Sequence, residues 1–256
     1  MTTLSVWLGL MLGGSILGWA INQPGGGANI LDRHGLFIVI GGAVAAMLTS
    51  TPASQLFSAI KSLFWILLPR STPTPEETLI EIVSLSRKAR AGGGLLALKN
   101  ESPEFMGGFV RRAIEAAAAC GETNAARHIL EIELRRRRVV RQEDANVFRT
   151  LGTLAPMFGL LGTLVGMLKV LTTMSDPTKL GPAMAMALSS AFIGIGMANF
   201  FCVPVAGQIR LQAMREMQLL DMVIEGVLAI AMNEPTYQVE LKMSSYVASP
   251  RSRGPA

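Results

Sequence analysis

Four apolar stretches, each long enough to approach the thickness of a lipid bilayer, set the strongest limit on the fold of this chain. They cover residues 4–21, 36–51, 151–171 and 184–205. A hydrocarbon core of about 30 Å needs roughly 20 apolar residues in a helix that rises 1.5 Å per residue. Of the 256 residues, 50% are hydrophobic and only 16% are charged, which is unusual for a soluble protein. The sequence therefore predicts an all-α membrane protein with four transmembrane helices.

The four stretches form two pairs, and a short turn-forming segment joins the members of each pair. The first segment reads NQPGGGANILDRHG and the second TTMSDPTKLGPA. The Asp-Pro and Gly-Pro steps of the second segment are expected to break the helix. No Lys or Arg precedes the first stretch, so we expect an anchor that is retained rather than a signal peptide. The predicted membrane part is therefore two helical hairpins.

Basic residues are distributed unevenly around these hairpins. Of the 23 Lys and Arg residues, 15 lie between residues 53 and 149 and five follow residue 205, whereas the two turns hold only Arg33 and Lys179. Basic residues mark the cytoplasmic side of a membrane protein. We therefore expect a multi-pass protein of the bacterial inner membrane with both termini and the middle segment in the cytoplasm. Orientation in the lipid membrane explains the net charge of +5, so nucleic-acid binding is not predicted.

These signals divide the chain into four parts. They are residues 1–52 with spans 1 and 2 and a short periplasmic turn, 53–149 as a helical cytoplasmic domain, 150–206 with spans 3 and 4, and 207–256 as a cytoplasmic C-terminal helix with a disordered tail.

Helical patterns fill the predicted cytoplasmic domain. The segment TPEE at residues 74–77 is typical of a helix start. Helices are predicted over residues 77–90, 95–100, 105–119 and 125–149, and the last of these runs directly into the third span. We interpret the run RRRR at residues 135–138 as a solvated, ion-paired helix face rather than a specific docking patch.

Small residues line one face of each of the last two spans. On the third span they are Pro156, Gly159, Thr163 and Gly166, and on the fourth span they are Ala183, Ala187, Ser190, Gly194 and Ala198. Each face carries one hydroxyl group. Thr163 lies eight residues from Leu171 and Ser190 lies eight residues from Pro182, at the outer ends of the two spans. The two hydroxyls are therefore expected at similar depth in the membrane.

Two interpretations of these faces are open. In the first, Gly159, Gly166, Ala187 and Gly194 only allow close helix packing, and each hydroxyl bonds to the carbonyl one turn back. In the second, the faces receive a partner helix that carries a carboxylate. None of the four stretches contains Asp or Glu, so a partner would have to supply the charge of an ion pathway.

Two prolines, Pro156 and Pro204, lie near the cytoplasmic ends of the third and fourth spans. Each removes a backbone donor and is expected to leave a kink. They are either hinges that transmit a change at the ion site or static bends of the kind that membrane helices tolerate.

Catalytic and metal-binding patterns are missing from the sequence. No Ser/His/Asp or Cys/His set converges, and the GGG at residues 92–94 lacks the Lys-Ser/Thr of a phosphate-binding loop. Neither histidine has ligand partners at suitable spacing, and Cys120 and Cys202 are expected in different compartments, so no disulfide is predicted. We predict a protein that is not an enzyme, has no cofactor and draws energy from an ion gradient.

Two segments of this chain are recognisable, LGTLAPMFGLLGTLVGMLKVL and DPTKLGPAMAMALSSAFIGIGMANFFCVPVAGQI. They resemble the third and fourth spans of MotA/PomA-type flagellar stator subunits of the MotA/TolQ/ExbB proton channel superfamily. The resemblance extends to ILDRHGLFIVIGGAVAAMLTSTP, RAGGGLLALKNESPEFMGGFVRRAIEA and VIEGVLAIAMNEP. Nearly the whole chain is covered, with the same order of spans.

The resemblance implies five copies of this chain around two copies of a single-span MotB/PomB-like partner that carries a membrane Asp. The transported ion is H⁺ or Na⁺. Thr163 matches the third-span position near that Asp, and Pro156 and Pro204 match the prolines tied to torque generation. Ser190 lies where the family commonly has Thr-Thr, although Ala191 takes one of those places. The ion is therefore left open.

The resemblance also implies contact with a flagellar rotor protein through charged residues. The candidates in this chain are Arg87, Lys88, Arg90, Lys99 and Glu101. Lys99 stands where the family commonly has Glu, and Arg90 is displaced by one residue. This departure favours a second hypothesis, an ExbB/TolQ-like energy-transducing subunit that drives a non-flagellar process in the cell envelope. A membrane scaffold without ion conduction is a third hypothesis.

Overall fold

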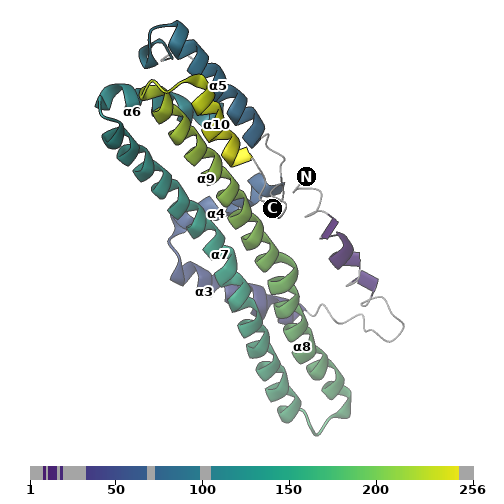
Figure 1. The fold of residues 1–256 in the computed structure, drawn as a ribbon. Coiled ribbons are helices and arrows are strands. Elements are labelled where there is room, and N and C mark those ends of the chain that lie inside the picture. Colours follow the sequence, from purple (N-terminus) through teal and green to yellow (C-terminus); the bar gives the residue numbers. More distant parts are fainter. Residues whose placement is uncertain are drawn as a thin grey trace, which may run out of the picture. The chain divides into compact units, whose positions relative to one another are not determined.

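The computed structural model describes residues 8–9, 11–15, 18–19, 33–67, 73–98 and 105–247, and within these ranges it contains helices and no strand. Figure 1 shows the chain coloured along its sequence. The fold divides into two compact units. The first comprises Met1–Pro69 and Arg141–Leu211, and the second comprises Arg70–Val140 and Gln212–Ala256. The prediction of an all-α protein is confirmed for the described part of the chain.

Three described helical stretches are long and apolar enough to cross a membrane. They are Arg33–Ser50, Thr123–Thr172 and Pro177–Ala231, and they contain the predicted second, third and fourth spans. Half of the predicted first span, residues 4–21, lies outside the described residues. The count of four spans therefore stays a prediction.

The second predicted span is built from three consecutive helical segments of the first unit. They are α2 (Arg33–Leu36), the π-helical segment η1 (Phe37–Gly41) and α3 (Gly42–Ser50). Thr51 is extended and Pro52 follows it, which ends the helix. The next helix, α4 (Ala53–Leu67), contributes Ala59 and Ile66 to a buried cluster with Met47 and Phe148.

The third span belongs to one helix of 50 residues, α7 (Thr123–Thr172), and Pro156 lies inside it. The sequence predicted this continuity between the cytoplasmic helix and the span. The turn that follows ends at Asp176, whose carboxylate accepts a hydrogen bond from the Thr178 amide at 3.1 Å. Helix α8 (Pro177–Gly196) then begins with a proline in its first position, where the missing N–H costs nothing.

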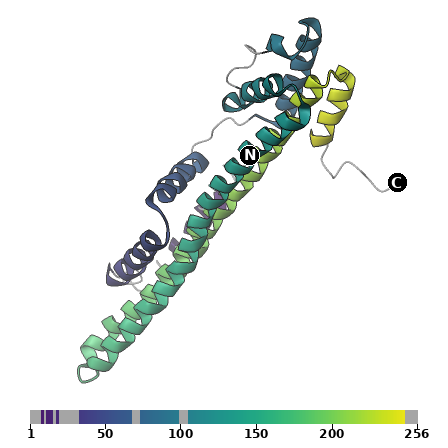
Figure 2. The same ribbon diagram turned by 90° about the vertical axis from the view of Figure 1, so that its left-hand side faces the viewer.

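One predicted break in this hairpin is wrong. Pro182 was expected to interrupt the chain before the fourth span, but it lies inside α8. Because Pro182 is in the second turn, its missing N–H removes a bond only at the end of the helix, next to the turn. The turn at residues 173–176, which ends in the Asp-Pro step, is what separates α7 from α8. Figures 1 and 2 both show α8 running alongside α7.

The fourth predicted span continues beyond α8 through a second π-helical segment. This segment is η4 (Met197–Cys202), and α9 (Val203–Ala231) follows it directly with Pro204 as its second residue. The expected helix after the fourth span is thus part of α9, which ends before Pro235.

The second unit contains α5 (Pro75–Ala91), two 3₁₀ segments, η2 (Leu95–Leu98) and η3 (Phe105–Gly108), and the helices α6 (Phe109–Cys120) and α10 (Thr236–Val247). The predicted start of α5 is confirmed by a capping box. The Glu77 amide donates to the Thr74 hydroxyl at 3.2 Å, and the Thr74 amide donates to the Glu77 carboxylate at 2.8 Å.

Two features of the second unit differ from the sequence prediction. The helix expected over residues 105–119 begins only at Phe109, because Met106 and Gly107 have left-handed conformations with φ of 52° and 65°. Helix α10 was not predicted at all. It packs against α5 and buries Val239 and Met243 completely. The predicted tail at residues 248–256 lies outside the described residues.

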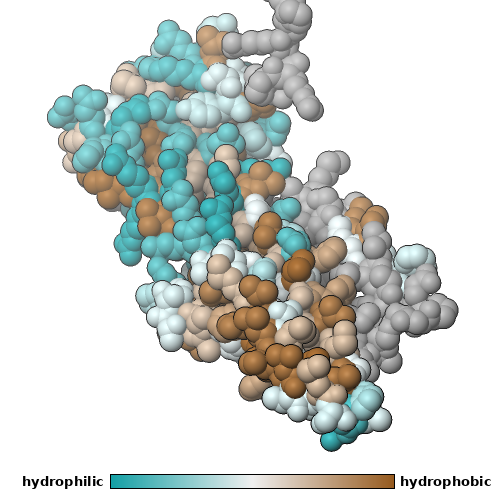
Figure 3. Space-filling view, turned by 90° about the horizontal axis from the view of Figure 1, so that it is seen from below, coloured by the Kyte–Doolittle hydropathy of each residue, from teal (hydrophilic) through white to brown (hydrophobic). Residues whose placement is uncertain are grey.

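Exposed apolar side chains cover the α7–α8 hairpin of the first unit. They include Met157, Leu160, Leu164, Leu168 and Leu171 on α7, and Leu188 and Ile195 on α8. Figure 3 shows a broad hydrophobic surface on the molecule. A continuous apolar surface of this kind is suited to lipid or to a partner helix, because in water it would be costly to leave exposed.

Candidate functional site

Glycines bring α7 and α8 into close contact within the first unit. A Cβ placed on Gly159 would lie 3.0 Å from the Ser190 carbonyl oxygen, and one placed on Gly166 would lie 2.6 Å from the Ala187 Cβ. From the other side, a Cβ on Gly194 would lie 2.5 Å from the Ala155 carbonyl oxygen. Such short distances leave room only for hydrogen, so the two backbones approach closely. The structure thus places Gly159, Gly166, Ala187 and Gly194 in one helix contact.

Ser190 lies inside this contact, with none of its surface exposed. Its hydroxyl donates a hydrogen bond to the Met186 carbonyl oxygen at 2.8 Å. Gly162 of α7 and Gly35 of α2 both face it, since a Cβ on either residue would come within 2.8 Å of the Ser190 hydroxyl oxygen. Helices α7 and α2 therefore cover the small face of the fourth span. At Ser190 the structure agrees with the first of the two interpretations, in which small residues allow close helix packing and the hydroxyl bonds to the carbonyl one turn back.

Thr163 has a different environment from Ser190. Its hydroxyl donates to the Leu160 carbonyl oxygen at 2.7 Å, and its side chain is only partly buried. It follows Gly162, which contacts Ser190, so the two hydroxyls lie at the same level of the hairpin. The four residues of the predicted third-span face have two different environments. Gly159 and Gly166 point into the contact with α8, whereas Pro156 and Thr163 lie at its edge.

Thr163 shares its edge of α7 with exposed apolar residues. Pro156, Leu160, Thr163 and Met167 follow one another at steps of four, three and four, which places them on one side of a helix. Leu160 is 63% exposed and Met167 is 52% exposed. A helix from another molecule could reach the Thr163 hydroxyl from this side, whereas Ser190 is accessible only if α2, α7 and α8 separate.

The contact between Gly152 and Cys202 relates the levels of the two prolines on the paired helices. A Cβ on Gly152 would lie 3.1 Å from the Cys202 Cβ and 3.5 Å from Val203, which precedes Pro204. Pro156 is one turn further along α7 than Gly152. The paired helices are antiparallel and Pro204 lies two residues to the other side of Cys202, so the structure places the two prolines nearly two turns apart along the hairpin.

A buried polar cluster next to α4 was missed by the sequence analysis. Asp144 of α7 is only 2% exposed, and its carboxylate accepts a hydrogen bond from the Ser62 hydroxyl at 2.5 Å. The Arg141 guanidinium donates to the same hydroxyl oxygen at 3.3 Å and lies 5.2 Å from the centre of the Trp65 ring. These contacts fasten α4 to α7. A buried carboxylate needs such partners, but the sequence gives no signal that pairs two residues 82 positions apart.

Within the second unit, the rotor-contact candidates that the structure describes are exposed. Arg87, Lys88 and Arg90 lie on the last two turns of α5 with exposed side chains. Lys99 and Glu101 lie outside the described residues. The charge reversal at Lys99 therefore stays an observation from the sequence.

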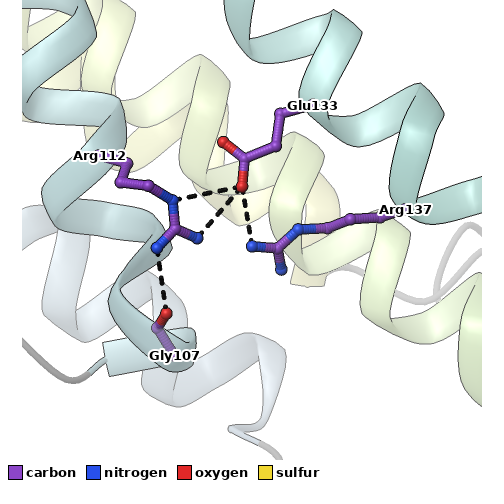
Figure 4. Close-up of polar contacts among 4 residues, drawn as sticks. All are labelled: Gly107, Arg112, Glu133 and Arg137. Carbon is purple, nitrogen blue, oxygen red and sulfur yellow. Dashed lines mark hydrogen bonds and ion pairs between the residues drawn. The ribbon is translucent and has the colours of Figure 1, made fainter.

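Arginines of α6 and α7 form an ion-paired network, drawn in Figure 4. One carboxylate oxygen of Glu133 accepts hydrogen bonds from Arg112 at 3.1 and 3.3 Å and from Arg137 at 2.8 Å. Arg112 also donates to the Gly107 carbonyl oxygen at 3.3 Å, so it holds the left-handed turn against α7. At Arg137, the arginine run of α7 is paired within its own unit, in the manner that the sequence indicated.

A second charged group of this unit involves α7 and α9. The Arg127 guanidinium donates two hydrogen bonds to the Glu225 carboxylate, the longer at 3.0 Å. This pairing lowers the pKa of Glu225 and raises the pKa of Arg127. One turn earlier on α9, burial raises the pKa of Asp221, and the positive charge of Arg138 opposes that shift in part. Among the described residues, no group of three or more His, Cys, Asp or Glu could hold a metal ion.

Comparison with known proteins identifies the family of this fold. The model of the MotA/TolQ/ExbB proton channel family matches residues 101–222. Motility protein A of Treponema phagedenis is 30% identical over 222 residues, which cover 86% of this chain and 82% of that protein. The chain belongs to the MotA/TolQ/ExbB proton channel family. The resemblance inferred from the sequence is thereby confirmed, and the family is one of channels rather than enzymes.

Other members of the MotA/TolQ/ExbB family match over nearly their whole length. Chemotaxis protein PomA of Vibrio alginolyticus is 28% identical over 244 residues, which are 95% of both chains. Two solved structures share the fold. A chain of C. jejuni MotAB has a TM-score of 0.86 at 21% identity and covers 98% of both chains. A chain of the flagellar MotAB stator complex from Bacillus subtilis has a TM-score of 0.84 at 23% identity and covers 94% of this chain and 95% of that one.

Proposed function

We propose that this chain is the larger subunit of an ion-driven stator that couples the flow of H⁺ or Na⁺ to torque on a flagellar rotor. The near full-length similarity to a chemotaxis protein and to chains of MotAB complexes supports this function. The observation that carries it is the position of Thr163. Its hydroxyl lies on an accessible edge of a hairpin whose spans contain no carboxylate, so a partner helix must bring the charge that moves the ion.

The proposed assembly places the chain in the bacterial inner membrane with both termini in the cytoplasm. Residues 1–52 and 150–206 form four spans, and residues 53–149 and 207–256 are cytoplasmic. Five copies surround two copies of a single-span partner that carries a membrane Asp. The apolar surface of the α7–α8 hairpin supports this arrangement, because it offers contact area both to lipid and to neighbouring helices.

At the ion site, we assign the direct role to Thr163 and a structural role to Ser190. Thr163 is partly exposed beside Leu160 and Met167, whereas Ser190 is fully enclosed by helices of its own chain. An ion bound to a partner carboxylate would gain an oxygen ligand from Thr163 in place of hydration water. Pro156 lies on the same edge two turns away, so it is suited to convert a change at the site into movement of α7.

The experiment is to produce the chain together with a single-span partner that bears one membrane Asp, and to measure ion flux and swimming. Thr163→Val keeps the shape of the side chain and removes the hydroxyl. We expect it, and also Pro156→Ala, to abolish ion-dependent swimming while assembly is preserved. Normal swimming in both variants would disprove the assigned roles.

Thr153→Val is the matched control for this experiment. Thr153 also lies on α7 and is exposed, and its hydroxyl donates to a backbone carbonyl, that of Arg149, at 3.2 Å. Its replacement removes the same kind of bond two to three turns away from Thr163. Ion flux close to that of the unmodified chain is expected for the control.

The alternative function is that of an ExbB/TolQ-like subunit that drives a non-flagellar process in the envelope. Lys99 supports it, because a positive charge there would repel a rotor surface made to meet Glu. A deletion strain distinguishes the two functions. Loss of swimming supports the stator, whereas unaffected swimming combined with retained ion flux supports the alternative.

A further inference from the structure

Helix α4 carries an exposed apolar face to which the proposed function gives no role. Phe57 and Phe64 are 74% and 57% exposed, and Ile60 and Trp65 are exposed beside them. At 100° per residue, these four side chains lie within about 140° of one another on one side of the helix. Ala59, on the other side, is fully buried in the cluster that joins α4 to α7. The helix therefore packs with one face and presents an aromatic face outward.

The position of α4 indicates what this outward face meets. Only Thr51 and Pro52 separate the helix from α3, so it begins at the predicted cytoplasmic edge of the second span. Its 15 residues give a length of about 22 Å, too short to cross a hydrocarbon core of about 30 Å. A short helix with exposed aromatic side chains at this edge is suited to the boundary between lipid headgroups and acyl chains.

A lysine lies within the aromatic face. Lys61 is the one basic residue of α4, and its exposed side chain projects between Phe57 and Trp65 around the helix. Its ammonium nitrogen lies 5.5 Å from the centre of the Trp65 ring. The Arg141 guanidinium of α7 lies 5.2 Å from the centre of the same ring. Two cations from two helices thus meet at one indole ring, within the range of cation–π attraction.

Acidic residues do little to balance these two cations. The sequence contains no Asp or Glu in residues 33–75. On α7, Asp144 is buried, and its carboxylate accepts a hydrogen bond from Ser62 on the packed side of α4. Glu143 follows Arg141 by two residues, which places it on the opposite side of α7. The surface around the tryptophan ring is therefore positive and attracts an anion.

We propose that the outward face of α4 binds an anionic phospholipid of the cytoplasmic leaflet, whose phosphate group is held by Lys61 and Arg141 beside the Trp65 ring. Ammonium and guanidinium groups both donate charge-assisted hydrogen bonds to phosphate oxygens. Phe57 and Phe64 contact the acyl chains of the same lipid layer. Because Lys61 belongs to α4 and Arg141 to α7, one phosphate bound to both bridges the two helices.

This inference goes beyond the proposed function. It rests on the proposed membrane location of the chain and does not depend on ion coupling.

The fluorescence of Trp65 tests the proposal. The chain has three tryptophans, so Trp7→Phe and Trp19→Phe, with a tryptophan-free single-span partner, leave Trp65 as the only indole of the complex. The complex is placed in phosphatidylcholine nanodiscs that contain either brominated phosphatidylglycerol or brominated phosphatidylcholine at the same mole fraction. Bromine quenches a nearby indole. We expect brominated phosphatidylglycerol to quench Trp65 more strongly, because it is enriched at the two cations.

Two lysine variants give the size of the effect. One cation near an anionic lipid surface changes lipid occupancy about fivefold. Lys61→Gln should therefore lower the enrichment of phosphatidylglycerol at Trp65 about fivefold. Lys169→Gln is the matched control, because it removes an exposed lysine near the other end of the third span, and its enrichment should equal that of the unmodified complex.

A salt titration of the unmodified complex covers the case in which Lys61→Gln fails to fold. The excess quenching by phosphatidylglycerol should decrease as sodium chloride is added, since salt screens exposed charges. An excess that does not respond to salt, equal quenching by the two lipids, or equal enrichment in the two lysine variants would overturn the proposal.

Other outcomes identify a different occupant. Absence of quenching by both lipids would mean that protein, such as a second copy of the chain, covers the face, and the proposal would be wrong. Inorganic phosphate that abolishes the excess quenching at constant ionic strength would assign the site to free phosphate and overturn it as well. A complex that does not enter nanodiscs would refute the membrane location. Absence of ion flux with the lipid preference intact would count against the proposed function alone.

Discussion

Adding one methyl group at Gly194 tests whether the close approach of α7 and α8 holds the hairpin together. In the Gly194→Ala variant the new Cβ would lie 2.5 Å from the Ala155 carbonyl oxygen and 3.1 Å from the Gly159 Cα. Both neighbours are backbone atoms, so neither can rotate away. The helices must separate until the contact reaches about 3.4 Å, the start of the ordinary van der Waals range.

The cost of this separation follows from two opposing effects. Overpacking of a tight contact costs about 1–3 kcal/mol. Replacement of glycine by alanine inside a helix contributes about 1 kcal/mol in the other direction. Gly196→Ala is the matched control, because it lies two residues further along the chain and its Cβ would have no neighbour within 4 Å. Gly196→Ala gains the helix propensity of alanine without any overpacking. The free energies of unfolding of the two variants should therefore differ by about 1–3 kcal/mol, or roughly 5- to 150-fold in the equilibrium constant.

Thermal unfolding of the complex in detergent, followed by helical circular dichroism, measures this difference. Gly194→Ala should unfold at a lower temperature than the unmodified chain, and Gly196→Ala at the same or a higher temperature. Ion flux should fall in Gly194→Ala, since separation of the helices displaces the edge that carries Thr163. Equal unfolding temperatures of the two variants would refute the inference that the two backbones touch at Gly194.

Two further predictions concern polar contacts. Ser62→Ala removes a hydrogen bond to the buried carboxylate of Asp144 and should cost about 1–3 kcal/mol in thermal unfolding. Glu225→Gln should destabilise the chain at pH 7 by at most about 1 kcal/mol, because Arg127 lowers the pKa of Glu225 and both side chains are partly screened by water. Since the folded pKa is the lower one, this contribution is present above the ordinary pKa of 4.5 and is lost as the pH falls through the folded value.

Matched variants provide the controls for these two predictions. Ser54→Ala changes an exposed serine of the same helix as Ser62, and its unfolding should match that of the unmodified chain. Asp221→Asn should change the stability of the chain in the opposite direction to Glu225→Gln. Burial raises the pKa of Asp221, so its charge is unfavourable at neutral pH and its removal should stabilise the chain there. Identical pH profiles for the two α9 variants would contradict the assigned pKa directions.

Local signals in the sequence were sufficient for much of the fold. The start of α5 was predictable because Thr74 and Glu77 cap the helix through bonds between near neighbours. The continuity of α7 was predictable because residues 125–171 contain no turn-forming segment. The spacing of small residues singled out Thr163 and Pro156, the family resemblance implied their roles, and the structure places both on the same edge of α7.

Other features depend on contacts between distant segments and were not predictable in this way. The enclosure of Ser190 requires Gly35 from α2 as well as Gly162 from α7. Gly162 could have been identified from the sequence, since it continues the spacing of Gly159 and Gly166 on the packed face of α7. The hydrogen bond between Ser62 and Asp144 and the packing of α10 on α5 join distant segments, so no local sequence pattern predicts them.

The π-helical segment η4 has a consequence for how tolerant the chain is to changes in length. The buried residues Ser190, Gly194, Ala198, Cys202 and Ala206 recur at a constant interval of four. In a regular α-helix an interval of four drifts by about 40° at each step, so the five residues would leave a common face. The wider turn of η4, with bonds five residues apart, offsets that drift. Deletion of one residue in this segment would turn all later residues by about 100°. We therefore expect single-residue insertions and deletions at residues 197–202 to be far more damaging than most substitutions there.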